Sequence, residues 1–457
     1  MTGFGYTGLM ADELDVIVLG LGVGGEEVGG KLADAGLSVL GIENRLVGGE
    51  CPYWGCIPSK MMIRASGLLT EGRRITGMAG ASEVFPDWAP VALRIRDEAT
   101  DSWNDKVAVD RFTGRGGRFL RGTGRLTGPK QVEVDGQTYT ARRGVVIATG
   151  TKAAIPPIPG LADAPYWTNK EAIETDTLPA SITVLGGGAI GLELAQMFAR
   201  FGVRVTIVEA MDRLMVYEEP ESSELITETL KREGVTVHTG SRAERVDGMT
   251  VHLADGSTVT SEKLLVATGR TSDLHKLGLD TVGLDPAAKA ITVDEHMRAA
   301  DGLWAVGDCT GHGAFTHMAM YQAGIAIRDI LGQGGPPADY RAQPRVTFTD
   351  PEIGSVGLTE DAARHHGIHV QTAYTKIPES ARGWIHKAGN EGFIKLVADM
   401  DRDVLVGATS AGPNGGEVLS ALAVAVHAQV PVHLLKNMIY AYPTFHRAIE
   451  AAVQQLD

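Results

Sequence analysis

Cysteine is scarce in this chain of 457 residues, with only three copies, at positions 51, 56 and 309. So few thiols exclude a small secreted scaffold held together by several disulfides, and they exclude a protein with several structural zinc sites. Any thiol chemistry of this chain therefore rests on a single pair at most.

Basic residues and long apolar runs are also limited. Lys and Arg number 42 against 56 Asp and Glu, which gives a formal net charge of −14. This acidic balance disfavours nucleic acid and anionic membranes as main partners. No stretch reaches the roughly 18 apolar residues of a membrane-spanning helix, and residues 1–13 lack the basic and apolar segments of a secretory signal. We therefore expect a cytoplasmic protein with no nucleic acid or membrane partner.

Glycine, in contrast, is abundant, with 58 copies, where an average usage near 7% would give about 32. The glycines follow no Gly-X-Y period and lie among apolar runs, so the chain is neither collagen-like nor of low complexity. The surplus must serve particular backbone sites. The length predicts about three domains.

A glycine-rich loop follows an apolar strand near the N-terminus. Residues 15–20 read DVIVLG, and a second apolar strand ends at Glu43. Gly20, Gly22 and Gly25 suit a tight turn that brings backbone close to a pyrophosphate at a helix N-terminus, and Glu43 would accept a ribose hydroxyl. A single loop of this kind also occurs where strand and helix simply pack closely.

The same pattern returns at Gly186, Gly188 and Gly191, and its second strand ends at Glu209. In both copies 23 residues separate the first glycine from the acidic residue. This repetition favours two nucleotide sites over two packing turns. A carboxylate here pairs with a free 2′-hydroxyl and repels a 2′-phosphate, so we predict NAD(H), with NADP(H) less favoured. Arg213 nearby would soften that preference.

Two cysteines, Cys51 and Cys56, lie five positions apart in the stretch GGECPYWGCIPSK at 48–60. A zinc site would need two more ligands, and no Cys/His pair of suitable spacing follows. A structural disulfide that closes so short a loop would add little stability. A redox-active pair is the better interpretation, and a helix that starts near Cys56 would favour its thiolate. We expect no metal site.

Two linkers divide the rest of the chain. A proline cluster at 155–160 suits an extended crossing between domains, and GQGGPPADY at 332–340 suits a second linker. The final 115 or so residues alternate short apolar runs with a helix near 416–428, which predicts a separate C-terminal domain.

Together these motifs resemble the class I pyridine nucleotide-disulfide oxidoreductases, the flavoprotein family of dihydrolipoamide dehydrogenase, glutathione reductase and mercuric reductase. The resemblance covers nearly the whole chain in the family's order, and the cysteine motif at 48–60 is its most specific part. The other matching segments are the loop at 20–25, ATG at 148–150, GGGAIGLE at 186–193, ATGR at 267–270, GD at 307–308, FTDPEIGSVGLTE at 348–360 and GPNGGE at 412–417.

The resemblance implies an α/β fold with two Rossmann-like dinucleotide-binding domains, in which an inserted NAD domain splits the FAD domain. A C-terminal α+β dimerisation domain follows. The implied boundaries are 1–151 for the first part of the FAD domain, 152–275 for the NAD(P)H domain, 276–335 for the return segment and 336–457 for the interface domain. It also implies a homodimer in which each C-terminal segment completes the partner's active site.

The resemblance assigns roles to the site residues. Cys51 would be the thiol that meets substrate, and Cys56 would exchange electrons with FAD. Lys60 and Glu193 match an ion pair beside the flavin N5. The remaining residues expected to bind FAD or NAD(H) are Gly20, Gly22, Gly25, Glu43, Gly49, Thr149, Gly150, Asp308, His317, Gly186, Gly188, Gly191, Glu209 and Gly269. In this scheme His317 begins a helix that points at the flavin, and Cys309 is a packing residue.

The C-terminal segment departs from the family's His-Pro-Thr-x-x-Glu signature, in which the histidine exchanges protons with the interchange thiol and the glutamate orients it. This chain has Tyr442 in the place of the histidine and Arg447 in the place of the glutamate. A tyrosine side chain titrates near pH 10 and is a poor base at neutral pH, which puts ordinary dithiol–disulfide turnover in question. His446 either substitutes as the base or is a surface or interface residue.

This departure leaves several functions open. Mercuric reductases also carry a tyrosine in this region, but they usually end in a cysteine pair, whereas this chain ends QQLD. The relative 2-ketopropyl-coenzyme M oxidoreductase/carboxylase also replaces the histidine by an aromatic residue, although its own histidine sits where this chain has Arg447. A quinone or diaphorase-type flavin reductase is a third function, for which the small Ala189 would leave the flavin approachable. An electron-transfer subunit of a larger complex is a fourth.

We predict an enzyme, an FAD-dependent NAD(P)H:disulfide oxidoreductase. Hydride would pass from NADH to flavin N5, and the electrons would then reduce a Cys51–Cys56 disulfide. Cys51 would transfer them to a small thiol, disulfide or other electrophilic substrate.

Overall fold

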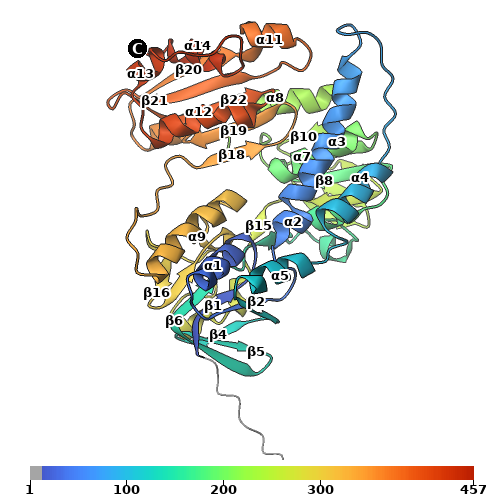
Figure 1. Cartoon of the computed structure of the whole chain (residues 1–457). Coiled ribbons are helices and arrows are strands. Elements are labelled where there is room, and N and C mark those ends of the chain that lie inside the picture. The colour runs from blue at the N-terminus through green and yellow to red at the C-terminus, as the bar shows by residue number, and fades with distance from the viewer. Residues whose placement is uncertain (1–12) are drawn as a thin grey trace, which may run out of the picture. The chain divides into compact units, whose positions relative to one another are not determined.

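A computed structural model describes residues 13–457 of the chain (Figure 1). These residues form two compact units. The first comprises the chain up to Cys56, Arg96–Lys152 and Arg270–Ala338. The second comprises Ile57–Ile95, Ala153–Gly269 and Asp339–Asp457. Each unit is thus assembled from segments that are far apart in the sequence.

The first unit is built on a mostly parallel sheet in the strand order β16-β17-β6-β1-β2-β3. Strand β1 is buried along its whole length, as expected for a parallel strand covered on both faces. The strands are β1 (Leu14–Leu19), β2 (Val39–Glu43), β3 (Arg118–Arg121), β6 (Gln137–Ile147), β16 (Arg298–Ala300) and β17 (Leu303–Ala305). A ribbon of β4 (Arg125–Gly128) and β5 (Gln131–Val134) extends the sheet from β6.

Alternate residues of β1 face two different apolar clusters. Val16 and Val18 pack with residues of the helices α1 (Val23–Asp34), α5 (Lys106–Gly114) and α9 (Thr316–Ile330). Ile17 and Leu19 pack on the other side with residues of β4 and β5 and of the segment around 274–291. The sheet is therefore a layer between helices and a smaller β ribbon, the arrangement expected of a dinucleotide-binding domain.

The second unit contains a parallel sheet in the order β10-β9-β8-β14. Its strands are β8 (Ser181–Leu185), β9 (Arg204–Val208), β10 (Thr236–His238) and β14 (Lys263–Val266). Helix α7 (Ala189–Arg200) connects β8 to β9, and α8 (Pro220–Arg232) leads into β10. An antiparallel ribbon, β11 (Ala243–Asp247), β12 (Thr250–Leu253) and β13 (Thr258–Thr260), shares an apolar cluster with this sheet.

The same unit contains a five-stranded antiparallel sheet in the order β18-β19-β22-β21-β20. These strands are β18 (Pro344–Thr347), β19 (Glu352–Gly357), β20 (Val370–Lys376), β21 (Phe393–Asp399) and β22 (Val404–Gly412). Helices α12 (Gly415–His427) and α14 (Arg447–Val453) contribute to its core. The helix expected to begin at His317 and the helix expected near 416–428 are confirmed as α9 and α12.

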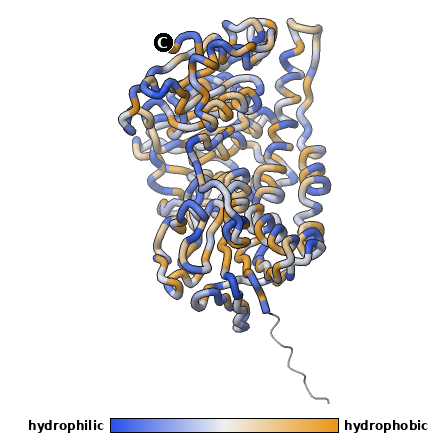
Figure 2. Tube along the Cα trace, turned by 60° about the vertical axis from the view of Figure 1, so that its left-hand side comes forward, coloured by the Kyte–Doolittle hydropathy of each residue, from blue (hydrophilic) through white to orange (hydrophobic). Residues whose placement is uncertain are grey.

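The described residues contain no helix long and apolar enough to cross a membrane, and Figure 2 shows apolar and hydrophilic residues interleaved along the trace. The α/β fold with two dinucleotide-type sheets and a C-terminal α+β part is as predicted.

Candidate active site

The first glycine loop joins β1 to α1 in a conformation that only glycine tolerates. Gly20 has φ +90°, and a Cβ there would lie 2.5 Å from the carbonyl oxygen of Ala148, the residue before Thr149. A Cβ on Gly25 would collide with the carbonyl oxygen of Gly20. Helix α1 begins directly after Gly22. Its first amides therefore point out of the helix, which fits the cradle expected for a pyrophosphate.

Glu43 closes this loop from the end of β2. One of its carboxylate oxygens accepts a hydrogen bond from the Leu21 amide at 2.8 Å, and the other accepts one from the Arg45 amide at 2.7 Å. The carboxylate is buried and aimed at the loop, as a ribose-binding acid requires.

The second loop repeats this geometry. Gly186 has φ +109°, a Cβ on Gly191 would collide with the Gly186 carbonyl, and α7 begins directly after Gly188. Glu209 accepts hydrogen bonds from the Gly187 amide at 2.6 Å and the Met211 amide at 2.7 Å. The two acidic residues thus hold their loops through matching pairs of amides.

Arg213 is turned toward its own loop. Its guanidinium donates to the carbonyl oxygens of Met215, Val216 and Glu218 at 3.1, 2.8 and 2.9 Å. The guanidinium of Arg213 is therefore engaged by carbonyl oxygens of its own loop.

The two cysteines of the 48–60 motif lie at a break between two helices. Cys51 is in the short helix α2 (Glu50–Trp54), and Cys56 is the first residue of α3 (Cys56–Arg74). Gly55 breaks the helices, and a Cβ there would lie 3.0 Å from the Glu50 carbonyl oxygen. Gly49, with φ +71°, lies so close to Gly22 that a Cβ would come within 2.8 Å of its Cα. The cysteine segment therefore packs directly on the first glycine loop.

Both cysteines are thiols in the structure, Cys51 half-buried and Cys56 exposed. A hydrogen bond with the Cys56 thiol, together with burial, raises the pKa of Cys51 well above its usual range. A hydrogen bond with Thr316 acts in the opposite direction on that pKa. Cys56 is the first residue of α3, so it lies at the N-terminus of a 19-residue helix.

Thr316 was missed by the sequence reasoning, which singled out only the next residue, His317. The Thr316 hydroxyl lies 3.5 Å from the Cys56 sulfur, and Thr316 is the first residue of α9. His317 stacks on Phe315, with ring centroids 5.2 Å apart. A threonine 260 positions from a cysteine leaves no local signal in the sequence.

Asp308 belongs to a polar chain around Arg270. The Thr151 hydroxyl donates to Asp308 at 2.6 Å. Arg270 donates to the hydroxyl and the carbonyl oxygen of Thr151 at 2.7 and 2.8 Å and to the Glu50 carboxylate at 2.6 Å. Arg270 and Glu50 were not predicted as site residues, although Glu50 directly precedes Cys51. The neighbouring Gly150 has φ +63°, and Gly269 has φ +120°.

Lys60 and Glu193 form the predicted ion pair in the second unit, with the Lys60 ammonium 2.7 Å from a Glu193 carboxylate oxygen. Lys60 lies one turn after Cys56 in α3, and Glu193 lies in α7. The other Glu193 oxygen accepts a hydrogen bond from the Phe348 amide at 2.8 Å.

Tyr442 and Arg447, which stand in place of the family's histidine and glutamate, contact each other. The Arg447 guanidinium lies 5.4 Å from the centre of the Tyr442 ring and pairs with Glu450 at 3.0 Å. Tyr442 is 69% exposed. His446 is held by a hydrogen bond between its Nδ1 and the Thr444 hydroxyl at 2.9 Å. These residues belong to the second unit, and the cysteines belong to the first.

Cys309 is fully buried, and burial raises the pKa of its thiol to about 12. Within residues 13–457, no group of three or more His, Cys, Asp and Glu side chains is placed to hold a metal ion.

Comparison with known proteins gives matches along nearly the whole chain. Residues 14–323 match the pyridine nucleotide-disulphide oxidoreductase family, and residues 343–453 match its dimerisation domain. The chain is 32% identical over 456 residues to mercuric reductase from Acidithiobacillus ferrooxidans, covering 97% of this chain and 82% of that protein. It is 33% identical over 467 residues to dihydrolipoyl dehydrogenase from Chlorobaculum tepidum, covering 97% of each.

Solved structures give the same result. LpdA from Mycobacterium tuberculosis superposes with a TM-score of 0.85 at 26% identity, over 97% of this chain and 100% of that one. The Cu(II) complex of the HOCl-induced flavoprotein disulfide reductase RclA from Escherichia coli has the same TM-score at 24% identity, over 98% of this chain and 100% of that one, and its likeness is one of fold.

The family uses FAD and a pyridine nucleotide, and the two glycine loops with Glu43 and Glu209 fit these cofactors. The matched dimerisation domain supports a homodimer. The chain belongs to the pyridine nucleotide-disulphide oxidoreductases and is an FAD-dependent enzyme of that family.

Proposed function

We propose that this enzyme reduces a small disulfide or similar electrophile at the expense of NADH, with Cys51 and Cys56 as the redox pair. The observation that carries the proposal is the hydrogen-bonded pair of thiols at the junction of α2 and α3, with the Thr316 hydroxyl against it. When bound, NADH and FAD supply the pair of electrons that keeps these thiols reduced.

The two thiols have different roles in the proposed reaction. The thiolate of Cys51 attacks one sulfur of the substrate disulfide, and the other sulfur leaves as a thiol once it takes up a proton. Cys56 then displaces the second substrate thiol and closes a Cys51–Cys56 disulfide. Because its bond to Cys56 raises the pKa of Cys51, proton transfer within the pair accompanies the first step. The Thr316 hydroxyl accepts from or donates to the Cys56 sulfur as its charge changes.

Tyr442 and Arg447 stand where the family has the histidine that transfers protons and the glutamate that orients it, so the proposed reaction must account for them. The tyrosine ring is stacked by a guanidinium whose charge is already paired with Glu450, and Thr444 holds His446. We propose that Tyr442 positions substrate, and that either His446 or the thiol pair itself moves the proton.

We propose NADH over NADPH. Supporting this choice, Glu209 directly follows β9 and accepts a hydrogen bond from the Gly187 amide of the glycine loop, and Arg213 donates to three carbonyls of its own loop. An incoming 2′-phosphate would meet a carboxylate without a neighbouring cation to offset it.

The domain limits expected from the resemblance, 1–151, 152–275, 276–335 and 336–457, are proposed as the functional division. In support, β16 and β17 of the return segment pair in one sheet with β1 and β6. The proposed dimer is supported by large apolar side chains exposed on the C-terminal part, namely Trp384, Leu434, Met438, Ile439 and Tyr442. The proposed location is the cytoplasm, because a thiol pair of this kind works in a reducing compartment.

The test is anaerobic reduction of the purified holoenzyme and of Cys56→Ser by NADH. The intact enzyme should develop the long-wavelength absorbance of a thiolate beside an oxidised flavin, and Cys56→Ser should lack it. Identical spectra for both proteins would refute the disulfide mechanism.

A second candidate is a flavin reductase that acts on quinones, favoured by the Tyr442–Arg447 contact in place of a histidine–carboxylate pair. Steady-state NADH oxidation with lipoamide, glutathione disulfide and a soluble quinone separates the two. Turnover with the quinone that survives Cys51→Ser, without turnover on either disulfide, would favour the quinone reductase.

A further inference from the structure

Three segments that are distant in the sequence meet at the Lys60–Glu193 pair. Helix α3 carries Lys60, α7 carries Glu193, and residues 348–350 follow strand β18 of the C-terminal sheet. We call residues 348–350 the bracing segment. All three belong to the second unit.

The bracing segment lies along one face of α7. Glu193, Gln196 and Arg200 are spaced by three and four residues and so share this face. Gln196 accepts from the Asp350 amide and donates to the Asp350 carbonyl oxygen, both at 2.8 Å, and Arg200 pairs with the Asp350 carboxylate at 2.9 Å. With the Phe348 amide on Glu193, the segment is fixed to α7 over two turns.

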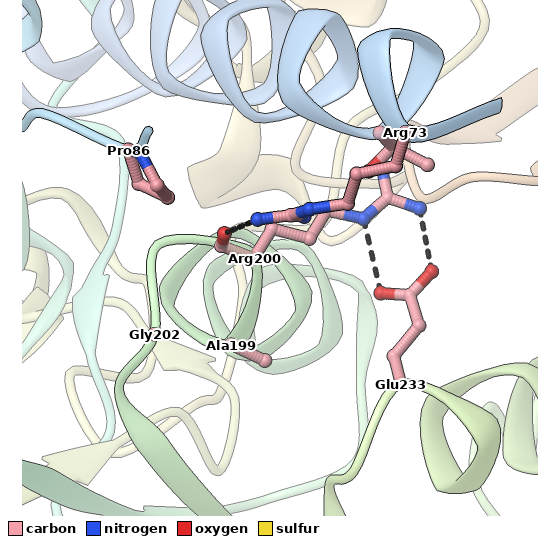
Figure 3. A pocket seen from close by; sticks show the side chains of 7 residues that line it. Arg73, Pro86, Ala199, Arg200, Gly202 and Glu233 are labelled. Atoms are coloured by element: carbon pink, nitrogen blue, oxygen red, sulfur yellow. Dashed lines mark hydrogen bonds and ion pairs between the residues drawn. The ribbon is translucent and has the colours of Figure 1, made fainter. Parts of the chain in front are cut away.

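Helix α3 also contacts Asp350 and Arg200. Arg74, at its end, pairs with Asp350 at 2.9 Å, and Arg73 donates to the Arg200 carbonyl oxygen at 3.1 Å. Figure 3 shows this end, where Arg200 is held by both oxygens of Glu233. A cavity of about 360 Å³ lies beside them, lined in part by Arg73, Arg200 and Glu233. Polar contacts therefore join the end of α3 both to α7 and to the bracing segment.

At the other end, Phe348 holds both members of the ion pair. Its amide donates to the Glu193 oxygen that Lys60 does not use, and the Lys60 ammonium lies 4.7 Å from the centre of its ring. Glu193 is nearly buried, but Lys60 keeps 34% of its side chain exposed. A long, half-exposed lysine has many rotamers, and a salt bridge alone restrains it weakly. The ring supplies a second restraint on the ammonium.

We propose that Phe348 is a positioning residue for Lys60, and that through it the dimerisation domain sets the orientation of this ammonium in the reductive half of the reaction. The inference rests on the proposed function, in which electrons enter from NADH. It assigns to the bracing segment a role beyond joining strands β18 and β19.

The experiment compares Phe348→Leu, Phe348→Tyr and the control Tyr374→Leu in the FAD-loaded enzyme. Tyr374 stacks on Phe393 in the same sheet, at 5.1 Å, and serves as an aromatic side chain remote from Lys60 in that sheet. Lysines are converted to ¹³C-dimethyl-lysine, which keeps the positive charge, and the Lys60 signal is assigned with Lys60→Arg. Its methyl resonance reports the aromatic ring directly, because protons above a ring face are shifted upfield. Anaerobic stopped-flow gives the rate at which NADH reduces the bound FAD.

We expect Phe348→Leu to lose the upfield shift of Lys60 and to slow FAD reduction about tenfold, the scale of a lost cation–π contact. Phe348→Tyr should keep the shift and stay within about twofold of the intact enzyme. An unchanged Lys60 resonance in Phe348→Leu would overturn the proposal. Equal slowing in Phe348→Leu and Tyr374→Leu would also overturn it, because the effect would then be general loosening of the sheet. Neither measurement needs the cysteine pair, so a failed disulfide mechanism would be recognised separately.

Discussion

Lys395 offers a stringent test of how the second unit is held together. Its ammonium lies within β21, 6% exposed, and pairs with Glu219, Glu221 and Glu360 at 3.0, 2.8 and 3.1 Å. These carboxylates come from the start of α8 and from α10 (Glu360–His365). Lys395→Met keeps the apolar stem and removes the positive charge that the three carboxylates share.

The expected loss follows from what the substitution leaves behind. Glu219 is 3% exposed, so it would stay buried without its cation. Removing one partner from a buried ion pair costs about 3–5 kcal/mol. Glu221 and Glu360 are about one-third exposed and add little, because water screens them. We expect the free energy of unfolding to fall by about 3–5 kcal/mol in total.

The pH dependence has a definite sign. Burial alone would lower the pKa of Lys395, but its hydrogen bonds to Glu221 and Glu219 outweigh burial and raise that pKa above 10.5. Its contribution is present below pH 10.5 and is lost as the pH rises through the folded value. Burial alone would raise the pKa of Glu360, but hydrogen bonds from Arg364 and Lys395 lower it below 4.5. That contribution is present above pH 4.5 and is lost as the pH falls.

Urea unfolding followed by tryptophan fluorescence between pH 4 and pH 10 measures the difference between the two proteins. The control is Lys376→Met. This lysine is 61% exposed, and its ion pair with Glu379 is long at 4.0 Å and lies at the surface. The control should change stability by less than about 0.5 kcal/mol. A Lys395→Met loss below about 1 kcal/mol at pH 7 would contradict this account of the cluster.

Three further outcomes follow from the site. Thr316→Val removes the hydroxyl that lowers the pKa of Cys51, so alkylation of Cys51 by iodoacetamide at pH 8 should slow severalfold; an unchanged rate would exclude the contact in solution. Tyr442→His restores an imidazole at the replaced position and should raise turnover on small disulfides about tenfold or more, as general acid–base catalysis allows; no gain would mean that Tyr442 does not limit this chemistry. Glu209→Ser should lower the KM for NADPH relative to that for NADH, and an unchanged ratio of kcat/KM values would show that Glu209 does not select the cofactor.

The glycine loops and their acids were predictable from the sequence because their requirements are local. Gly20 and Gly186 need positive φ, and each acid sits 23 residues later, at the end of the next strand. The loop, helix and strand between them fix that spacing regardless of the rest of the protein. The closeness of Cys51 and Cys56 was equally predictable, since the two residues are five positions apart.

Contacts between distant segments were not predictable in this way. Thr316 meets Cys56 across 260 positions, and Phe348 meets Glu193 across 155. Neither residue type signals its partner, because a threonine at a helix start and a phenylalanine at a strand end are both ordinary. The family resemblance supplied Lys60 and Glu193 but not the residues that hold them. Only the folded arrangement shows that Arg270 joins Glu50 to Thr151.

The hydrogen bonds between Thr151 and Arg270 also bear on how such a chain could have arisen. The chain leaves the first unit after Lys152 and returns to it at Arg270. Arg270 donates hydrogen bonds to both the hydroxyl and the carbonyl oxygen of Thr151. The points at which the chain leaves and re-enters the first unit therefore lie side by side. A whole nucleotide-binding domain can be inserted at such a place without disrupting the sheet of the first unit, because domain insertions are tolerated where the two chain ends lie close together. Arg270 therefore holds together the two ends of the first unit between which residues 153–269 are inserted.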